Sequence, residues 1–285
     1  MMRTLSTRLL SLAAGLLFGT AALAQAPVCE PARVAEKYPA LAGKTIRVGV
    51  DPQTPPYASR DPKDFNLITG SDMELAKAVF ACLGVRYELK PGAWSGLLPA
   101  IIADQLDLMF YLYYNATRVK QVDFVTYMKA GTGALTQAGN PKAIKSGDDL
   151  CGKTVAVGLG TVEEAQMRQL DGTCKGAGKA GVEVMTYPDH AAGFRLVQTA
   201  RADIMLSDLA LIDSQVSQNP SVYSRAYGVV SGFQIGVATR KGNEPLHKAM
   251  LDGLRGVQAA GTQSAIFKKY AIDPSLELAA TSRVD

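Results

Sequence analysis

The sequence predicts an α/β protein built from two lobes of similar plan. Strands rich in valine and isoleucine alternate with helical segments, which is the pattern of mostly parallel sheets. The second half repeats the scheme of the first, since A-D-Q-L-D-L-M-F at residues 103–110 is echoed by A-R-A-D-I-M-L-S-D at residues 200–208. Once a predicted leader is removed, about 260 residues remain, more than one hydrophobic core usually holds. We therefore expect two mostly parallel sheets flanked by helices.

Each half is expected to begin with a strand and to continue with alternating helices and strands. Over residues 70–83 the apolar side chains Met73, Leu75, Val79 and Phe80 recur with helical period. The elements expected in the first half are strands at 44–51, 85–89 and 106–111, a proline-rich turn at 51–62, and helices at 70–83 and 95–103. Those expected in the second half are strands at 153–158, 182–187 and 202–206, and helices at 162–170 and 190–200.

The end of the chain is expected to return to the first lobe, through a strand at 233–239 and helices at 244–260 and 262–270. The chain would then cross between the lobes twice, in segments that contain Gly131, Gly133 and Gly232. Two crossings permit a hinge and a ligand cleft. The expected organisation is a leader at 1–24, lobe 1 at 25–129 and again at 235–285, crossovers at 130–134 and 229–234, and lobe 2 at 135–228.

The first residues have the composition of an export signal. Residues 1–8 carry two arginines, residues 9–23 are mainly apolar, and Ala22-Leu23-Ala24 supplies a small-x-small cleavage site. The apolar run is too short for a membrane span and shows no amphipathic period, which speaks against an ordinary buried helix. Val28 before Cys29 is unlike a lipoprotein signal. We expect cleavage near Ala24 and an exported, soluble protein.

Charge and cysteine content further limit the class of protein to which the chain can belong. Without Arg3 and Arg8, 28 basic residues face 26 acidic ones, which gives no reason to expect nucleic acid or membrane surfaces as partners. An exported chain with four cysteines favours disulfides, for which three pairings are possible. We expect Cys29–Cys82 and Cys151–Cys174, because each pair then lies within one half of the chain; the alternative is that one or more remains a buried thiol.

Arg118 is the first candidate ligand residue. It follows an apolar strand and the tyrosine-rich segment at 111–114, in a region that also holds Trp94, the single tryptophan. A guanidinium can bind a carboxylate through two parallel hydrogen bonds and stays charged. The alternative is a surface arginine beside the following turn. The pattern indicates a pocket for a small carboxylate.

Asp208 and the loop before Thr161 are the next candidates. Asp208 follows the buried strand at 202–206, where a carboxylate could hold an ammonium group, although Asp is also a good helix N-cap. The sequence Gly158-Leu-Gly160-Thr161 lies between a strand and a helix, and backbone N–H groups at a helix start attract anions.

The remaining sequence patterns are weaker indications of function. Residues 147–154 fit the phosphate-loop spacing letter for letter, but Lys153-Thr154 begins a strand where that loop needs a helix. Two or three of the five cleft aromatics are expected to touch ligand, the others filling the core; the five are Tyr57, Trp94, Tyr111, Tyr113 and Tyr114. Neither histidine has metal-ligand spacing, and no hydrolase motif or cofactor fingerprint is visible.

The chain resembles the periplasmic solute-binding proteins of ABC importers, in the group that carries polar amino acids. The resemblance covers residues 44–270 and rests on ordered motifs. These are I-R-V-G-V-D-x-x-x-P-P-Y, G-S-D-M-E-L-A, W-x-x-L-L-P-A, T-R-x-K-x-V-D-F-V-x-Y, G-K-T-V-A-V-G-x-G-T and A-D-I-M-L-S-D. It implies a type II periplasmic binding protein fold, with two lobes closing on a ligand.

The resemblance also implies roles for single residues. Arg118 would bind an α-carboxylate, the Gly160-Thr161 loop would support that carboxylate, and Asp208 would hold the α-ammonium group. Trp94, Asp51 and Tyr57 match the aromatic residue and the first ligand loop of the family. Where members usually have small hydroxyl residues, this chain has Tyr111-Leu-Tyr113-Tyr114-Asn115, so carboxylate recognition is a firmer expectation than amino-acid recognition.

The leading hypothesis is a monomeric, non-enzymatic binding protein that delivers an amino acid or related carboxylate to a membrane permease. One alternative is an accessory protein of a quinoprotein dehydrogenase system. Another is a periplasmic dehydratase on the same scaffold, for which Glu163, Glu164 and Asp208 are the nearest pocket acids. A fold alone does not decide between these functions.

Overall fold

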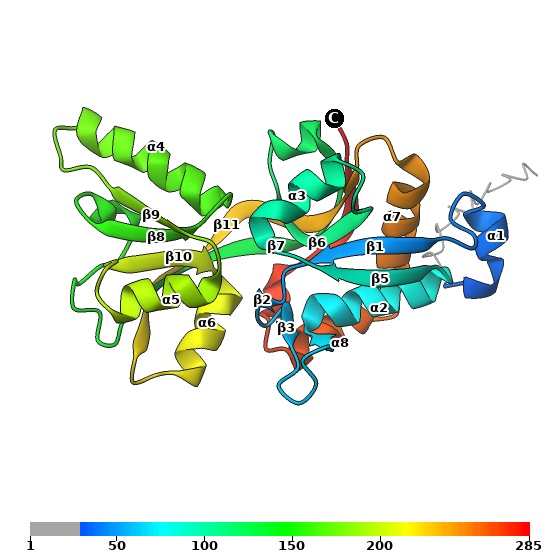
Figure 1. Cartoon of the computed structure of the whole chain (residues 1–285), viewed down its shortest axis with the longest axis horizontal. Coiled ribbons are helices and arrows are strands. Elements are labelled where there is room, and N and C mark those ends of the chain that lie inside the picture. The colour runs from blue at the N-terminus through cyan, green and yellow to red at the C-terminus, as the bar shows by residue number, and fades with distance from the viewer. Residues whose placement is uncertain (1–28) are drawn as a thin grey trace, which may run out of the picture.

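The frame of the molecule is a curled sheet that runs through both lobes. The structure is a computed structural model that describes residues 29–285; the expected leader at 1–24 lies outside that part. Figure 1 shows the two lobes side by side, joined by the long strands β7 and β11. The hydrogen-bonded strand order is β5 (Arg86–Pro91), β1 (Thr45–Val50), β6 (Leu108–Tyr114), β11 (Tyr223–Arg240), β7 (Val122–Gln137), β10 (Ile204–Asp208), β8 (Thr154–Gly158) and β9 (Glu183–Tyr187), with β12 (Glu277–Arg283) also paired to β7.

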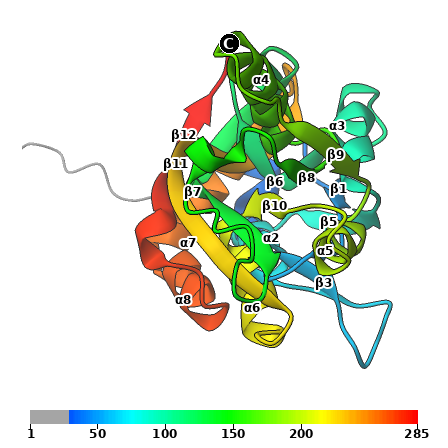
Figure 2. The same ribbon diagram turned by 90° about the vertical axis from the view of Figure 1, so that its left-hand side faces the viewer.

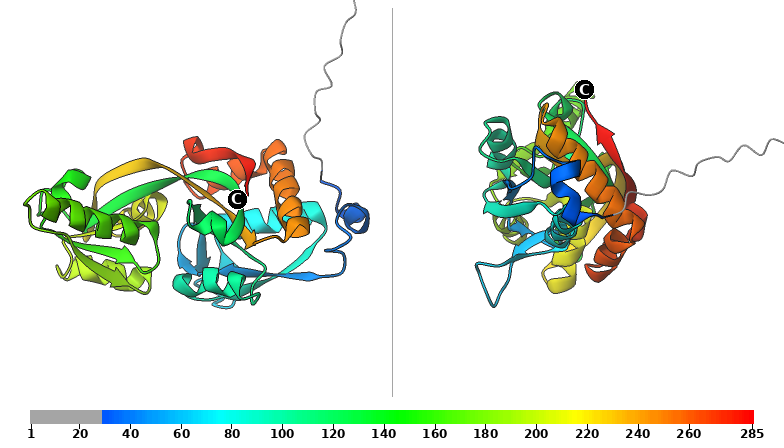
Figure 3. Two further views of the ribbon diagram at one scale, coloured as in Figure 1. Left: turned by 90° about the horizontal axis from the view of Figure 1, so that it is seen from above. Right: turned by 90° about the vertical axis from the view of Figure 1, so that its right-hand side faces the viewer.

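Strand direction follows the two-lobe plan. In lobe 1, β1 runs parallel to β5 and β6, and in lobe 2, β8 runs parallel to β9 and β10. β7 and β11 pair antiparallel with each other over nearly their full length, and with β10 and β6 respectively. Figure 3 shows these two strands spanning from one lobe to the other. Each lobe therefore contains the expected parallel strands, but β7, β11 and β12 pair antiparallel and unite the two sets into one mixed sheet of nine strands instead of two separate sheets.

Helices cover the faces of each lobe. Lobe 1 carries α2 (Ser71–Leu83), α3 (Trp94–Ile102), α7 (Glu244–Ala259) and α8 (Thr262–Lys269), and lobe 2 carries α4 (Val162–Gly176), α5 (His190–Gln198) and α6 (Leu209–Gln218). Figure 2, viewed from the lobe 2 side, shows α7 and α8 on the flank of the sheet that is opposite α3. The shortest pieces are α1 (Val34–Lys37) and the 3-10 turns Pro31–Arg33, Arg118–Lys120, Gly147–Leu150 and Pro274–Leu276. No helix of the described chain is long and apolar enough to cross a membrane.

The expected elements are present, with several additions. β6 continues past the expected end of its strand at 111 and runs through the tyrosine-rich segment to Tyr114. β7, α6 and β12 are not among the expected elements, and β11 begins ten residues earlier than the expected strand at 233. The proline-rich turn contains a small sheet of β2 (Gln53–Thr54), β3 (Ala58–Arg60) and β4 (Ile68–Thr69). Glycines within β7 and β11 obscured the strand pattern in the sequence, because glycine normally marks a turn.

Each lobe has its own core. In lobe 1 the sheet packs on α2 and α7 through residues such as Leu75, Val79 and Leu254, all about fully buried. In lobe 2, Val155, Val157 and Leu206 form one cluster against α4, and a second lies under α5 and α6. Both expected disulfides are present: Cys29–Cys82 joins the N-terminal segment to α2, and Cys151–Cys174 joins the start of lobe 2 to α4.

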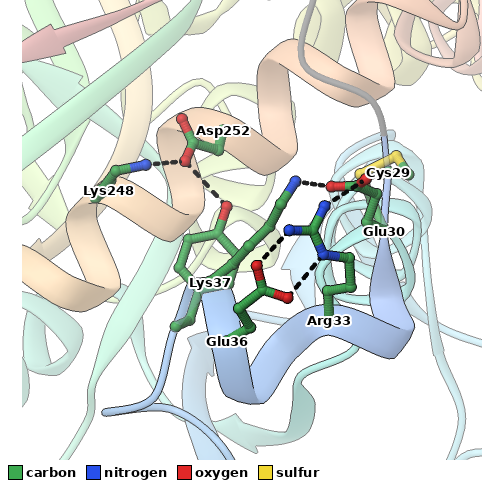
Figure 4. Close-up of polar contacts among 9 residues, drawn as sticks. Cys29, Glu30, Arg33, Glu36, Lys37, Lys248 and Asp252 are labelled. Atoms are coloured by element: carbon green, nitrogen blue, oxygen red, sulfur yellow. Dashed lines mark hydrogen bonds and ion pairs between the residues drawn. A yellow bond between two sulfur atoms is a disulfide. The ribbon is translucent and has the colours of Figure 1, made fainter.

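The N-terminal segment is held to lobe 1 by polar contacts as well. Figure 4 shows Arg33 lying between Glu30 and Glu36, with Lys37 also directed at Glu30. The Tyr38 hydroxyl donates to Asp252 of α7 at 2.9 Å. Together with the Cys29 disulfide, these contacts place the start of the described chain on the lobe 1 surface, remote from lobe 2 (Figure 1).

Candidate functional site

A cavity between the two lobes gathers nearly all the predicted ligand residues. Lobe 1 contributes Asp51, Thr54, Tyr57, Trp94, Tyr111, Tyr113 and Arg118. Lobe 2 contributes Gly158, Leu159, Thr161, Val162, Glu163, Tyr187, Pro188, Asp189, His190, Ser207, Asp208 and Leu211. The carboxyl ends of β1, β8 and β10 face this cavity, as expected for open α/β sheets. Gly160 does not line the cavity, and it contacts Arg118 instead.

Arg118 is buried without an ion pair. Asn115 accepts hydrogen bonds from the backbone N–H groups of Thr117 and Arg118, and this turn starts the short 3-10 helix that presents the guanidinium. The guanidinium donates to the carbonyl oxygens of Tyr113 and Gly160, each at 2.9 Å, and the residue is 8% exposed. Within residues 29–285 it makes no salt bridge, and burial lowers its pKa while the charge of Glu163 acts in the opposite direction. A buried cation bonded only to carbonyls can accept an anionic partner.

Asp208 performs two tasks at once. It is the N-cap of α6, accepting from the backbone N–H groups of Ala210 at 2.9 Å and Leu211 at 3.3 Å. It also accepts from the hydroxyl of Tyr57 at 2.7 Å and that of Tyr113 at 3.3 Å. Burial raises its pKa, and the hydrogen bond from Tyr57 opposes that change. The N-cap reading and the cleft-facing reading are therefore both correct.

Tyr111 enters the cleft because β6 is bulged. Between Met109 and Leu112, β6 has one residue more than the facing part of β11, and Tyr111 has a left-handed φ of 62°. Such an extra residue turns a side chain away from the regular alternation. The Tyr111 ring stacks on Tyr57 with centroids 4.0 Å apart and meets Trp94 edge-on at 6.1 Å. Its buried hydroxyl has no hydrogen-bond partner in the part of the chain described.

Tyr57 is positioned by a close backbone approach. Gly70, the N-cap of α2, has a φ of 134°, and a Cβ there would lie 2.2 Å from the Tyr57 carbonyl oxygen. Only glycine fits this contact, which fixes the segment that carries Tyr57 against the start of α2. The Tyr57 hydroxyl then reaches across to Asp208 in the other lobe.

Asp51 and Thr161 line the cleft and also shape their own loops. Asp51 accepts from the backbone N–H groups of Gln53 at 3.1 Å and Trp94 at 3.2 Å, so it holds the first residue of α3. The Thr161 hydroxyl caps α4 by accepting from the Glu164 N–H at 3.2 Å, and it donates to the Gly158 carbonyl at 2.9 Å. Tyr114, the fifth predicted aromatic, packs against Phe124 and does not line the cavity.

Several cleft residues were not singled out as ligand residues from the sequence. Glu163 is 5% exposed in the first turn of α4, and burial raises its pKa to about 7. His190 contacts the Gln53 carbonyl of lobe 1 at 2.9 Å through Nδ1, and Ser207 lies 3.4 Å from its Nε2. The two-residue spacing from Thr161 to Glu163 was the available signal for Glu163. His190 offered none, because its position depends on how the lobes meet.

The cleft carries more acidic than basic groups. Asp51, Glu163 and Asp208 are all buried, against the single buried guanidinium of Arg118. Among residues 29–285, no cluster of three or more His, Cys, Asp and Glu side chains is arranged to hold a metal ion. The arrangement is suited to binding a small polar molecule, with a cation at one point, a carboxylate at another, and aromatic rings between them.

Comparison with known proteins agrees with this geometry. The model of the bacterial extracellular solute-binding proteins, family 3, matches residues 46–273. The chain is 35% identical over 231 residues to the L-cystine-binding protein TcyJ of Escherichia coli strain K12, a match that covers 79% of this chain and 82% of that protein.

Solved structures resemble it as well. An ancestral arginine-binding protein bound to arginine has a TM-score of 0.71 and 32% identity, covering 79% of this chain and 97% of that chain. The same kind of protein bound to glutamine has a TM-score of 0.72 and 31% identity, covering 80% and 98%. The expected fold class and the expectation of a binding protein rather than an enzyme are confirmed, and neither alternative function finds support among these relatives. The chain belongs to the bacterial extracellular solute-binding proteins, family 3.

Proposed function

We propose that the protein captures a small amino-acid-like carboxylate in the interlobe cleft and delivers it to the membrane permease of an ABC importer. The observation that carries the proposal is Arg118, a cleft guanidinium that is 8% exposed and has only backbone carbonyls as partners in the described chain. A desolvated cation gains most from a charged partner, and a carboxylate matches its geometry.

The other cleft groups complete this assignment. Asp208 lies opposite Arg118 in the other lobe, where its carboxylate can accept from a ligand ammonium group in place of a tyrosine hydroxyl. Thr161 and the backbone of its loop support the carboxylate end. The rings of Tyr57, Trp94 and Tyr111 enclose the body of the ligand, and the partnerless Tyr111 hydroxyl supplies a further hydrogen-bond donor. Asp51 faces the same space.

Residues 130–134 and 229–234 act as the hinge in this proposal. They lie in β7 and β11, near the irregular register between Val230 and Gln234. Opening at this place would expose Arg118 and Asp208, and closure would bury them with the ligand. We propose that the exported, monomeric protein works in the periplasm, where the cystine-binding and arginine-binding names of its relatives suggest which ligands to try first.

The test is to identify what the protein binds. Native mass spectrometry of gently purified protein should detect a bound small carboxylate. Trp94 fluorescence should then change in a saturable manner with at least one member of a panel made of the standard L-amino acids and L-cystine. The amine that lacks the carboxyl group of the best binder is the matched control, and it should bind at least about a hundredfold more weakly. Equal binding of the amine, or no binding across the panel, would overturn the proposal.

A further inference from the structure

Glu163 is a buried acid that the proposed function leaves without a task. It lies in the first turn of α4, lines the cleft and is 5% exposed. A carboxylate at this depth should have a cationic partner or carry a proton. It forms no salt bridge with Arg118 among the described residues, although the charge of each acts on the other.

The surroundings of Glu163 come from four other elements and contain one cation. Arg118 arrives from the turn after β6, and its guanidinium bonds to the carbonyl of Gly160, three residues before Glu163. Asp208 at the end of β10 adds a like charge. Tyr113 of β6 and Tyr187 of β9 are the neutral titratable groups that feel its charge. The nearby Asp51, Asp189 and His190 line the same cavity.

These charges conflict when a carboxylate enters the cleft. Arg118 can balance one negative charge, but the ligand carboxylate and an ionised Glu163 would present two within a desolvated space. Like charges at short range in a buried site are costly, and the usual outcome is that one of the two groups becomes protonated. The ligand carboxylate has direct access to the guanidinium, so Glu163 is the group that can give up its charge.

We propose that Glu163 takes up one proton when a carboxylate binds to Arg118, so that ligand capture by this protein is coupled to protonation. The inference rests on the proposed function, because it requires the ligand carboxylate to bind at Arg118. In the balanced step, the bound carboxylate adds one negative charge, and one proton from solvent or buffer converts Glu163 from carboxylate to carboxylic acid. Arg118 keeps its proton throughout.

The sign of the pH dependence follows from this exchange. In the closed arrangement described, burial raises the pKa of Glu163 to about 7, and an anionic neighbour raises it further. Below about pH 6 Glu163 is already protonated, so binding requires no proton and affinity is constant. Above about pH 7 each binding event must collect a proton, so affinity falls by up to about tenfold per pH unit. Asp208 would have the opposite effect on proton uptake. A ligand ammonium group favours the ionised form of Asp208, so any proton on this carboxyl would be released on binding.

Titration calorimetry measures the coupling directly. The best amino acid of the panel above is titrated at pH 8 in two buffers with different ionisation enthalpies, which yields the number of protons taken up. We expect about one proton per molecule bound for the natural chain. Glu163→Gln should keep binding, reduce the uptake by about one proton and flatten the affinity between pH 6 and pH 8.

Asp72→Asn is the matched control. Asp72 is another buried carboxyl whose pKa burial raises to about 7, but it lies at the start of α2 and bonds to Tyr127. The coupling should persist in this variant. Titrating Glu163→Gln also cancels any proton that the amino acid itself exchanges.

The outcomes separate the two proposals. Binding that depends on Arg118 but shows the same proton uptake in the natural chain and in Glu163→Gln would overturn the role of Glu163 and leave the proposed function intact. If Glu163→Gln fails to fold, Glu163→Ala is titrated in the same two buffers, and an uptake equal to that of the natural chain contradicts the inference. Binding that is indifferent to Arg118 would overturn both.

Discussion

At the scale of single residues, the cleft is notable for buried charges that lack charged partners. Arg118 bonds to two backbone carbonyls, and Asp208 bonds to hydroxyl and N–H groups. Glu163 is buried in the cleft and Asp72 is buried outside it, at the start of α2, and burial raises the pKa of each to about 7. Such groups lower stability in exchange for binding or specificity, a pattern that is common at functional sites.

Asp72 allows the effect of a buried carboxyl group on folding stability to be tested separately from ligand binding. Its folded-state pKa of about 7 is above the ordinary carboxyl value, so its proton stabilises the fold at low pH. That contribution is complete below about pH 4 and is lost as the pH rises through 7. In thermal melts, the stability of Asp72→Asn relative to the natural chain should increase from pH 4 to pH 7 by up to about 1.4 kcal/mol per pH unit and then level off. Stability curves of Asp72→Asn and the natural chain that run parallel across this pH range would contradict the assignment.

The sequence predicts some of these residues and not others. Arg118 and Asp208 could be found because each follows an apolar strand, and strand ends meet at one sheet edge. Glu163 could be named only as one of the acids nearest the pocket, because a single residue in the first turn of a helix gives no signal of how deeply it is buried. The role of His190 could not be predicted, because its partner Gln53 is far away in the chain.

At the scale of elements, the bulge in β6 decides what the cleft contains. It places Tyr111 between Tyr57 and Trp94, and it faces a stretch of β11 that includes Gly236. A Cβ on Gly236 would lie 2.6 Å from the carbonyl oxygen of Val125 in β7. The register of β11 on β7 also shifts between Ile235 and Gly236, so the two strands approach closely beneath the bulge.

Gly236→Ala should therefore disturb the sheet under the site. The added methyl group meets backbone that cannot move aside easily, so we expect a loss of about 1–3 kcal/mol, typical of overpacking. That loss would lower the melting temperature by roughly 3–10 °C for a chain of this size. Gly172→Ala, a helical position in α4 with nothing within 4 Å, should be neutral or stabilising. Equal melting temperatures for the two variants would show that the close approach is not restrictive.

The local pattern predicts most short elements, such as α2 and β8, because each has a clear period or apolar run. It fails for β7 and β11. In β7 the buried residues occupy consecutive positions around Gly131 and Gly133, whereas residues 224–232 of β11 are partly exposed or exposed, show no regular alternation and include Gly228. The alternation that identifies a half-exposed strand is absent when both faces are covered. Only the pairing between these distant segments reveals them as strands.

At the scale of the whole molecule, contacts across the cleft hold the lobes together. Tyr57 bonds to Asp208, Arg118 to Gly160, and His190 to the Gln53 carbonyl. Each contact joins a residue of lobe 1 to one of lobe 2, and each involves a cleft residue or its loop. Because Arg118 and Asp208 are almost fully buried by these contacts, a ligand can reach them only when the lobes separate.

Small-angle X-ray scattering should detect this motion. A saturating amount of the best amino acid from the panel should decrease the radius of gyration, because the bound molecule favours the closed arrangement. The same addition to Arg118→Ala, which lacks the proposed anchor, should leave the scattering unchanged. A natural chain that binds its amino acid without any change in scattering would argue against a hinge at residues 130–134 and 229–234.

The most direct test of the account is the affinity of Arg118 variants for the amino acid that binds best. Calorimetric titration should show a loss of about a hundredfold or more in Arg118→Ala, because the buried carboxylate loses its charged partner. Arg118→Lys keeps the positive charge but not the paired donors, so its affinity should lie between those of the natural chain and of Arg118→Ala. The exposed Arg168→Ala, whose side chain pairs with Glu164, should bind as the natural chain does. A folded Arg118→Ala that binds within a few-fold of the natural chain would contradict the central claim.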